Sequence, residues 1–82
     1  MADDTTLARL RAIWVELLDG TDVGDGDHFV ELGGDSIAAA LCVTRIAAEF
    51  GVEIPVVTLF LDETTLRTLA RVVDAAATGA PD

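Results

Sequence analysis

The sequence contains no lysine, no tyrosine, one cysteine and one histidine among its 82 residues. Its five cationic side chains, all arginine, stand against 15 carboxylates, which gives a net charge of −10 at pH 7. Nucleic acids and anionic membrane surfaces repel such a chain, so we expect neither as a ligand. The acidity fits either a basic protein partner or simply the solubility of a small, apolar-rich domain.

The single cysteine, Cys42, excludes an intrachain disulfide and fits a reducing compartment. No apolar run approaches the roughly 20 residues of a membrane-spanning helix. Met1 to Asp4 are acidic where a secretory signal would be basic. We therefore expect a cytoplasmic chain. Cys42 is assigned to the polar side of its helix, as a partly exposed thiol without a role.

The absence of tyrosine and the abundance of Ala, Leu and Val favour helices over strands. Apolar residues spaced by threes and fours predict helices over 5–18, 37–50 and from 64 or 65 to 76. Residues 56–61 are predicted as a short helix, because no partner strand exists for them. The fold class is all-α, a small four-helix bundle with a long first loop and a short third helix. One domain spans 1–82, with its core at 5–77 and a flexible tail at 78–82.

The first helix is expected to begin behind the capping candidates Asp3 to Thr6 and to end at Asp19-Gly20. The long loop that follows, residues 19–35, carries six carboxylates and five glycines. A loop of this length in a compact domain is usually functional or packed onto the core. The apolar residues expected to hold it there are Val23, Phe29, Val30 and Leu32.

The second helix has two apolar stripes, which is one more than a small domain needs. The stripe assigned to the core contains Ala39, Val43, Ile46, Ala47 and Phe50, with Arg45 and Glu49 opposite in water. The other stripe contains Ile37, Leu41, Thr44 and Ala48. Either this helix is buried on two sides, or the second stripe is a docking surface. We favour docking, because Ile37 lies beside the exposed Ser36.

Ser36 stands at the point where the loop enters the second helix. Gly33 and Gly34 loosen the backbone, Asp35 caps the helix, and the helix dipole favours an anionic group on Ser36. A catalytic serine needs a nearby base, yet the only histidine, His28, lies upstream in the loop. This excludes the esterase that Gly34-Asp35-Ser36-Ile37 superficially suggests. The serine is therefore interpreted as a passive attachment point.

Metal binding is not expected. A calcium loop opening at Asp25-Gly26-Asp27 would place Phe29, Val30 and Ser36 where ligands or glycine are required. One histidine and one cysteine, far apart in the sequence, do not make a zinc site. The loop carboxylates are interpreted as a solvated surface, His28 as a surface residue and Trp14 as core.

Residues 27–37 (DHFVELGGDSI) resemble the attachment motif of carrier proteins, D-x-F-F-x-L-G-G-[HD]-S-[LI]. In particular they resemble peptidyl carrier proteins of nonribosomal peptide synthesis. The resemblance covers most of the chain: Leu10-x-x-Ile13-Trp14-x-x-Leu17-Leu18, the segment 50–55, and Leu59-Phe60 followed by Leu66-x-x-Leu69-Ala70. Val30 departs from the usual Phe, and the stretch between Phe60 and Leu66 is one residue longer than usual.

The resemblance implies an acyl-carrier-protein-like bundle that catalyses nothing. Ser36, within the Gly33-Gly34-Asp35 motif, would accept 4′-phosphopantetheine from coenzyme A through a phosphopantetheinyl transferase with Mg²⁺. The arm would hold an aminoacyl or peptidyl thioester for an adenylation enzyme and for condensation or tailoring enzymes. The docking residues would be Ile37, Leu41, Thr44, Ala48 and Phe60. We expect a monomeric, discrete carrier that acts in trans.

Two alternatives remain. A polyketide-type acyl carrier protein would accept the same arm, and a helical interaction module would carry no cargo. A fatty acyl carrier is disfavoured, because Glu49 is the single acid of the second helix and because the site has the Gly33-Gly34 pair.

Overall fold

The computed structural model describes residues 2–77 and confirms the all-α fold. Its elements are α1 (Ala2–Leu17), α2 (Ser36–Phe50), the short 3-10 helix η1 (Val56–Phe60) and α3 (Leu66–Ala77). Within the described residues there is no strand, only an isolated antiparallel bridge between His28 and Thr65. No helix in this part of the chain is long and apolar enough to cross a membrane. The predicted tail, 78–82, lies outside the described residues.

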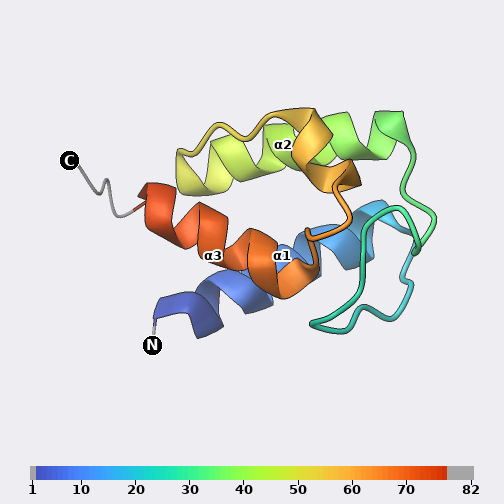
Figure 1. Cartoon of the computed structure of the whole chain (residues 1–82), viewed down its shortest axis with the longest axis horizontal. Helices are drawn as coiled ribbons and strands as arrows, with labels where there is room; N and C mark the ends of the chain where they lie inside the picture. The colour runs from blue at the N-terminus through green and yellow to red at the C-terminus, as the bar shows by residue number, and fades with distance from the viewer. Residues whose placement is uncertain (1, 78–82) are drawn as a thin grey trace.

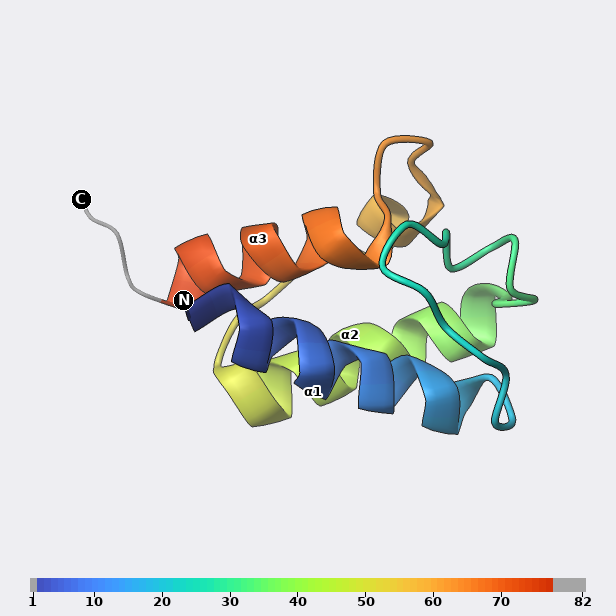
Figure 2. The ribbon, with the colours of Figure 1, turned by 90° about the horizontal axis from the view of Figure 1, so that it is seen from below.

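The three long helices lie side by side, with α1 antiparallel to both α2 and α3 (Figure 1). α1 packs against both of these helices, and η1 packs against α2. The loop between α1 and α2, the start of α2, η1 and the turn into α3 all lie at one end of the molecule (Figure 2). Two segments far apart in the sequence, residues 18–36 and 56–65, therefore lie at the same end of the molecule.

Residues beside α2 determine where the helix begins and where it ends. The Asp35 carboxylate accepts the Ala38 N–H at 2.9 Å and caps the first turn. At the other end Gly51 takes the left-handed conformation, with φ of 69°, and donates its N–H to the carbonyl of Ala47. Both ends confirm the prediction for this helix.

α1 differs from the prediction at its start. The helix is already formed at Ala2, so Thr5 and Thr6 lie inside it and do not cap its start as predicted. Thr6 lies inside the helix and is buried, and its hydroxyl donates to the Asp74 carboxylate at 2.8 Å. This contact joins α1 to α3, so Thr6 serves tertiary packing instead of a helix end.

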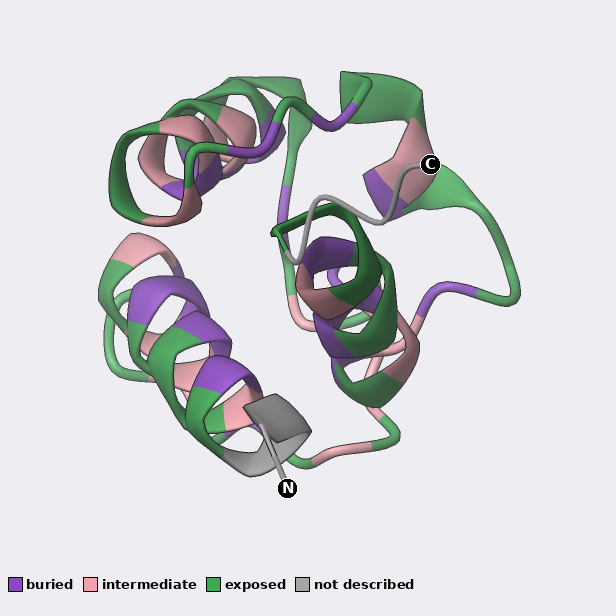
Figure 3. Cartoon of the chain, turned by 90° about the vertical axis from the view of Figure 1, so that its left-hand side faces the viewer, coloured by how far each residue is buried: buried purple, intermediate pink, exposed green. Residues whose placement is uncertain are grey.

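The core lies where the three long helices face one another (Figure 3), and residues of the long loop complete it. Phe29, from the loop, is fully buried and meets Trp14 of α1 edge to face, with ring centroids 5.1 Å apart. Val23 is also buried, and Leu32 packs partly against the core. Val30 is 47% exposed, so its assignment to the core is wrong. The tight turn of residues 29–33 points it outward.

Cys42 is fully buried, which corrects its assignment to the polar side of the helix. It lies three residues after Ala39 and four before Ile46, so all three share the core face of α2. Burial raises the pKa of the Cys42 thiol to about 11, although the Trp14 indole N–H and the charge of Arg45 oppose this increase. The thiol is therefore a small apolar core group.

The long loop is tied to two helices through Asp25. Arg11 of α1 and Arg67 of α3 both pair with the Asp25 carboxylate, the second at 2.7 Å. The backbone N–H groups of Arg67 and Leu66 donate to the carbonyls of Asp25 and Asp27 at 2.9 and 3.0 Å. The interpretation of these acids as a merely solvated surface is therefore wrong for Asp25. Within the described residues no cluster of side chains is suited to a metal ion.

Candidate functional site

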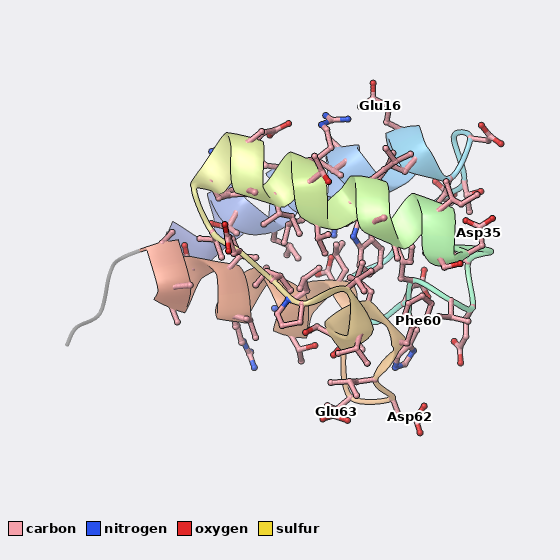
Figure 4. All side chains as sticks on the ribbon, turned by 90° about the horizontal axis from the view of Figure 1, so that it is seen from above. Glu16, Asp35, Phe60, Asp62 and Glu63 are labelled. Atoms are coloured by element: carbon pink, nitrogen blue, oxygen red, sulfur yellow. The ribbon has the colours of Figure 1, made fainter. Side chains whose placement is uncertain are left out.

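Ser36 is the first residue of α2, and its side chain is exposed at the end of the helix where the loop arrives. Asp35, directly before it, is extended, with φ of −105° and ψ of −174°, and its carbonyl accepts the Ala39 N–H at 2.9 Å. Figure 4 shows Asp35 at this end of the molecule. The structure thus has Ser36 where the sequence predicts it, accessible and at the positive end of a helix.

The two glycines before Asp35 meet different requirements. Gly33 has φ of 99°, in the left-handed region that favours glycine. A Cβ on Gly34 would lie 2.3 Å from two carbons of the Phe29 ring and 2.9 Å from its carbonyl oxygen. Both glycines are fixed by hydrogen bonds, from Gly33 to Val30 and from Gly34 to Phe29. The prediction that they loosen the backbone is therefore wrong, since they hold the turn that presents Ser36.

The environment of Ser36 suits an anionic substituent. The helix terminus offers backbone N–H groups and a positive dipole end to a phosphate oxygen. The neighbouring Asp35 carboxylate is turned to its capping bond with Ala38. A phosphodiester on the Ser36 hydroxyl therefore has both the space and the electrostatic setting that it requires.

His28 is not positioned as a base for Ser36. Its Nε2 donates to the Asp62 carbonyl oxygen at 2.6 Å, and its Nδ1 lies 3.4 Å from the Glu31 carboxylate. Both ring nitrogens are thus engaged away from the serine. No sequence pattern indicates this contact, because His28 and Asp62 are 34 residues apart. The imidazole joins the loop to the turn between η1 and α3, so it is more than the surface residue expected.

The second apolar stripe of α2 is exposed, so the alternative of a helix buried on two sides is wrong. Ile37 is 72% exposed and Leu41 51% exposed, and Thr44 and Ala48 continue the stripe. We call these four residues the outer stripe. Phe60 of η1 is 39% exposed and lies at the same end of the molecule as Asp35 (Figure 4).

A groove beside this surface was not expected from the sequence. It has a volume of about 430 Å³ and lies between the loop and the end of η1. We call it the loop–η1 groove; it is lined by His28, Val30, Glu31, Leu59, Phe60, Leu61 and Asp62. It is formed only where two segments about 30 residues apart meet, which explains why periodicity did not reveal it.

Comparison with known proteins places this geometry in context. The family model described as the phosphopantetheine attachment site matches residues 8–73. The chain is 43% identical over 72 residues to the non-canonical nonribosomal peptide synthetase cpsA of Aspergillus campestris. It is 42% identical over 72 residues to the phosphinothricin tripeptide synthetase PhsC of Streptomyces viridochromogenes. These matches cover 85% and 88% of this chain but only 7% and 6% of the two synthetases.

A solved structure shows the same fold. It contains the phosphopantetheine transferase Sfp in complex with coenzyme A and a peptidyl carrier protein. The matched chain superposes with a TM-score of 0.79 at 28% identity, and the match covers 85% of this chain and 90% of that one.

Proposed function

Because this chain belongs to the phosphopantetheine attachment-site family, as a non-catalytic carrier domain of the peptide synthetase type, we propose that Ser36 is its attachment residue. The observation that carries the proposal is the exposed Ser36 at the start of α2, behind a turn fixed by Phe29 and Gly34. Ser36 is also the only serine of the chain.

The proposed modification is a group transfer carried out by a separate transferase. The Ser36 oxygen attacks the coenzyme A phosphorus that bears the pantetheine group, and a new P–O bond forms. The pyrophosphate bond breaks, adenosine 3′,5′-bisphosphate leaves, and a base of the transferase takes the hydroxyl proton. This chain contributes an accessible hydroxyl, the helix N-terminus and the rigid turn. When attached, the arm supplies a terminal thiol for thioester formation.

We propose that the cargo is an aminoacyl or peptidyl group. The support is the similarity to two peptide synthetases over most of this chain, together with the near absence of acids on α2. A tethered cargo reaches its partner enzymes at a high effective concentration. Loading by an adenylating enzyme supports this cargo, whereas loading with malonyl by an acyltransferase would assign the chain to the polyketide type.

The outer stripe and Phe60 are proposed as the surface that partner enzymes contact. Their exposure supports this, because apolar side chains grouped beside an attachment residue are typical of docking sites. The partners by resemblance are the transferase, an adenylation enzyme and condensation or tailoring enzymes.

Action in trans is also proposed. The buried hydrophobic residues of the described part lie between Leu10 and Val73 and form one core, which supports folding of this chain as a separate unit. The 82-residue chain is therefore expected to be modified and loaded by separately added enzymes.

The test is incubation of the chain with coenzyme A, Mg²⁺ and a phosphopantetheinyl transferase, followed by intact-mass measurement. We expect one phosphopantetheinyl adduct on the wild type and none on Ser36→Ala. The exposed hydroxyl of Thr5 provides the matched control, and Thr5→Ala should be modified like the wild type. Circular dichroism should show unchanged helix content in both variants. An adduct that persists in Ser36→Ala, or no adduct on the wild type, overturns the assignment.

A further inference from the structure

The loop–η1 groove combines an apolar wall with acidic groups. Val30, Phe60 and Leu61 are between 39% and 47% exposed and are grouped on this groove. The acidic residues Glu31 and Asp62 also line the groove, and no arginine lines it. A ligand that fits this groove has an apolar portion and a cationic group.

The groove is built on the same turn that presents Ser36. The Val30 carbonyl accepts the N–H of Gly33, and three residues further on the chain reaches Ser36. The opposite wall, at the end of η1, is held against the loop by the hydrogen bond from His28 to the Asp62 carbonyl oxygen. Figure 4 shows Asp35 and Phe60 at the same end of the molecule, and Ser36 follows Asp35 directly, so an arm on Ser36 starts at the end of the molecule that carries the groove.

We propose that the loop–η1 groove holds the aminoacyl end of the arm on Ser36, with the α-ammonium group at Glu31 and Asp62. This inference rests on the proposed function. An α-amino group is largely protonated at neutral pH or slightly below, and adjacent carboxylates favour the protonated form. The apolar parts of the arm and of the amino-acid side chain contact Val30, Phe60 and Leu61.

The proposal implies that the groove distinguishes the forms of the carrier by charge. An aminoacyl thioester carries a cation, whereas an N-acylated or peptidyl thioester has an uncharged amide nitrogen at the same position. A malonyl group is anionic and is repelled by the two carboxylates. The aminoacyl form therefore occupies the groove, and acylation of the nitrogen releases the cargo.

The experiment compares three forms of the full chain: the free-thiol form, a leucyl form and an N-acetylleucyl form. A transferase attaches each arm from a coenzyme A analogue in which a stable amide replaces the thioester, and intact mass verifies attachment. Amide chemical shifts are then recorded at pH 6.5. We expect the leucyl arm to shift the amides of Val30, Glu31, Leu61 and Asp62 at least twofold more than the N-acetylleucyl arm does, each relative to the free-thiol form.

A charge variant tests the source of this difference. In Glu31→Gln/Asp62→Asn the loop stays joined to the turn after η1, because His28 bonds the backbone carbonyl of Asp62. The variant changes only the 3.4 Å ion pair of His28 with Glu31. The leucyl-specific shift should fall at least twofold in this variant. The matched control Asp19→Asn/Asp22→Asn neutralises two exposed loop carboxylates outside the groove and should leave the shift unchanged.

Equal shifts for the leucyl and N-acetylleucyl arms would overturn the proposal, as would no shift beyond the free-thiol form or an unchanged shift in the charge variant. These results are distinguishable from failure of the proposed function. If Ser36 is not the attachment residue, the mass measurement shows this before any spectrum is recorded.

Discussion

Gly34 helps to position Ser36 because it has no side chain beyond a hydrogen atom. The Phe29 ring occupies the space where any other side chain at position 34 would begin, and Phe29 is itself held by Trp14. The serine two residues later is therefore placed by the aromatic core and not only by the helix that it starts.

Gly34→Ala is expected to lower the free energy of unfolding by about 2 kcal/mol, because its Cβ forces the Phe29 ring and backbone to move. Urea denaturation followed by Trp14 fluorescence measures the change. Gly26→Ala is the matched control, since a Cβ there meets nothing within 4 Å and the backbone is not left-handed. It should leave stability unchanged or slightly raised. Equal stability of the two variants would contradict the steric argument.

Cys42 gives a second prediction at this scale, on pH dependence. Its pKa in the folded state is about 11, against 9.0 ordinarily, so above pH 9 the unfolded chain loses this proton while the folded chain retains it. Stability is therefore complete below about pH 9 and falls between about pH 9 and 11. The expected slope is about 1.4 kcal/mol per pH unit.

The chain has no lysine or tyrosine, so neither of these side chains titrates in the pH range of the Cys42 effect. Urea unfolding between pH 8 and 10.5 should show the decline in the wild type. Cys42→Ala should be less stable at pH 8 but should lack the slope. The same decline in Cys42→Ala would assign the effect to another group.

At the scale of elements, α2 has one face in the core and another in solvent. Ala39, Cys42 and Ile46 are fully buried, whereas Ile37 and Leu41 are more than half exposed. Arg45 pairs with Glu16 of α1, and Glu49 pairs with Arg9 of α1 as well as with Arg45. Arg45 and Glu49 therefore join α2 to α1 and do not simply project into water.

Ile37→Asp is expected to raise the apparent KM of the transferase for the carrier roughly tenfold, which is the cost of losing one buried apolar contact at an interface. Stability should not fall, because the side chain is 72% exposed and an acid suits the first turn of a helix. The control is Val72→Asp, an exposed apolar position on α3, which should be modified at the wild-type rate. Unfolding of Ile37→Asp would contradict the exposure of the outer stripe.

At the scale of the whole molecule, the contacts of the long loop gather the site at one end. Asp25 connects Arg11 of α1 to Arg67 of α3, and His28 connects the loop to the turn after η1. A connection of this length would otherwise cost considerable entropy to order. The fastened loop is what allows Ser36, the outer stripe and the groove to keep fixed relative positions.

Asp25→Asn should lower the melting temperature by about 5 °C. It weakens two ion pairs worth about 1 kcal/mol together at a partly exposed carboxylate. Thermal denaturation measures the change, and 1 M salt should reduce the difference from the wild type. Asp22→Asn, an exposed acid of the same loop, should melt like the wild type. If the two variants melt alike, the Arg11–Asp25–Arg67 contact does not stabilise the loop.

Sequence alone was sufficient for features that depend on residues within a few positions of one another. The periodicity of the helices, the Asp35 cap, the Gly51 end and Ser36 at the start of α2 are of this kind, since helical hydrogen bonds and caps link positions three or four apart. The burial of Cys42 was also readable from its spacing to Ala39 and Ile46, although the assignment made from the sequence was wrong.

Only the tertiary structure decided the rest, because it depends on contacts between distant segments. The Phe29 ring that requires glycine at 34 contacts Trp14, which lies on α1, 15 residues before Phe29. The Asp25 ion pairs, the His28 contact and the loop–η1 groove join residues 14 to 42 positions apart. No local periodicity encodes such pairings, since they form only when the helices pack and bring their ends together.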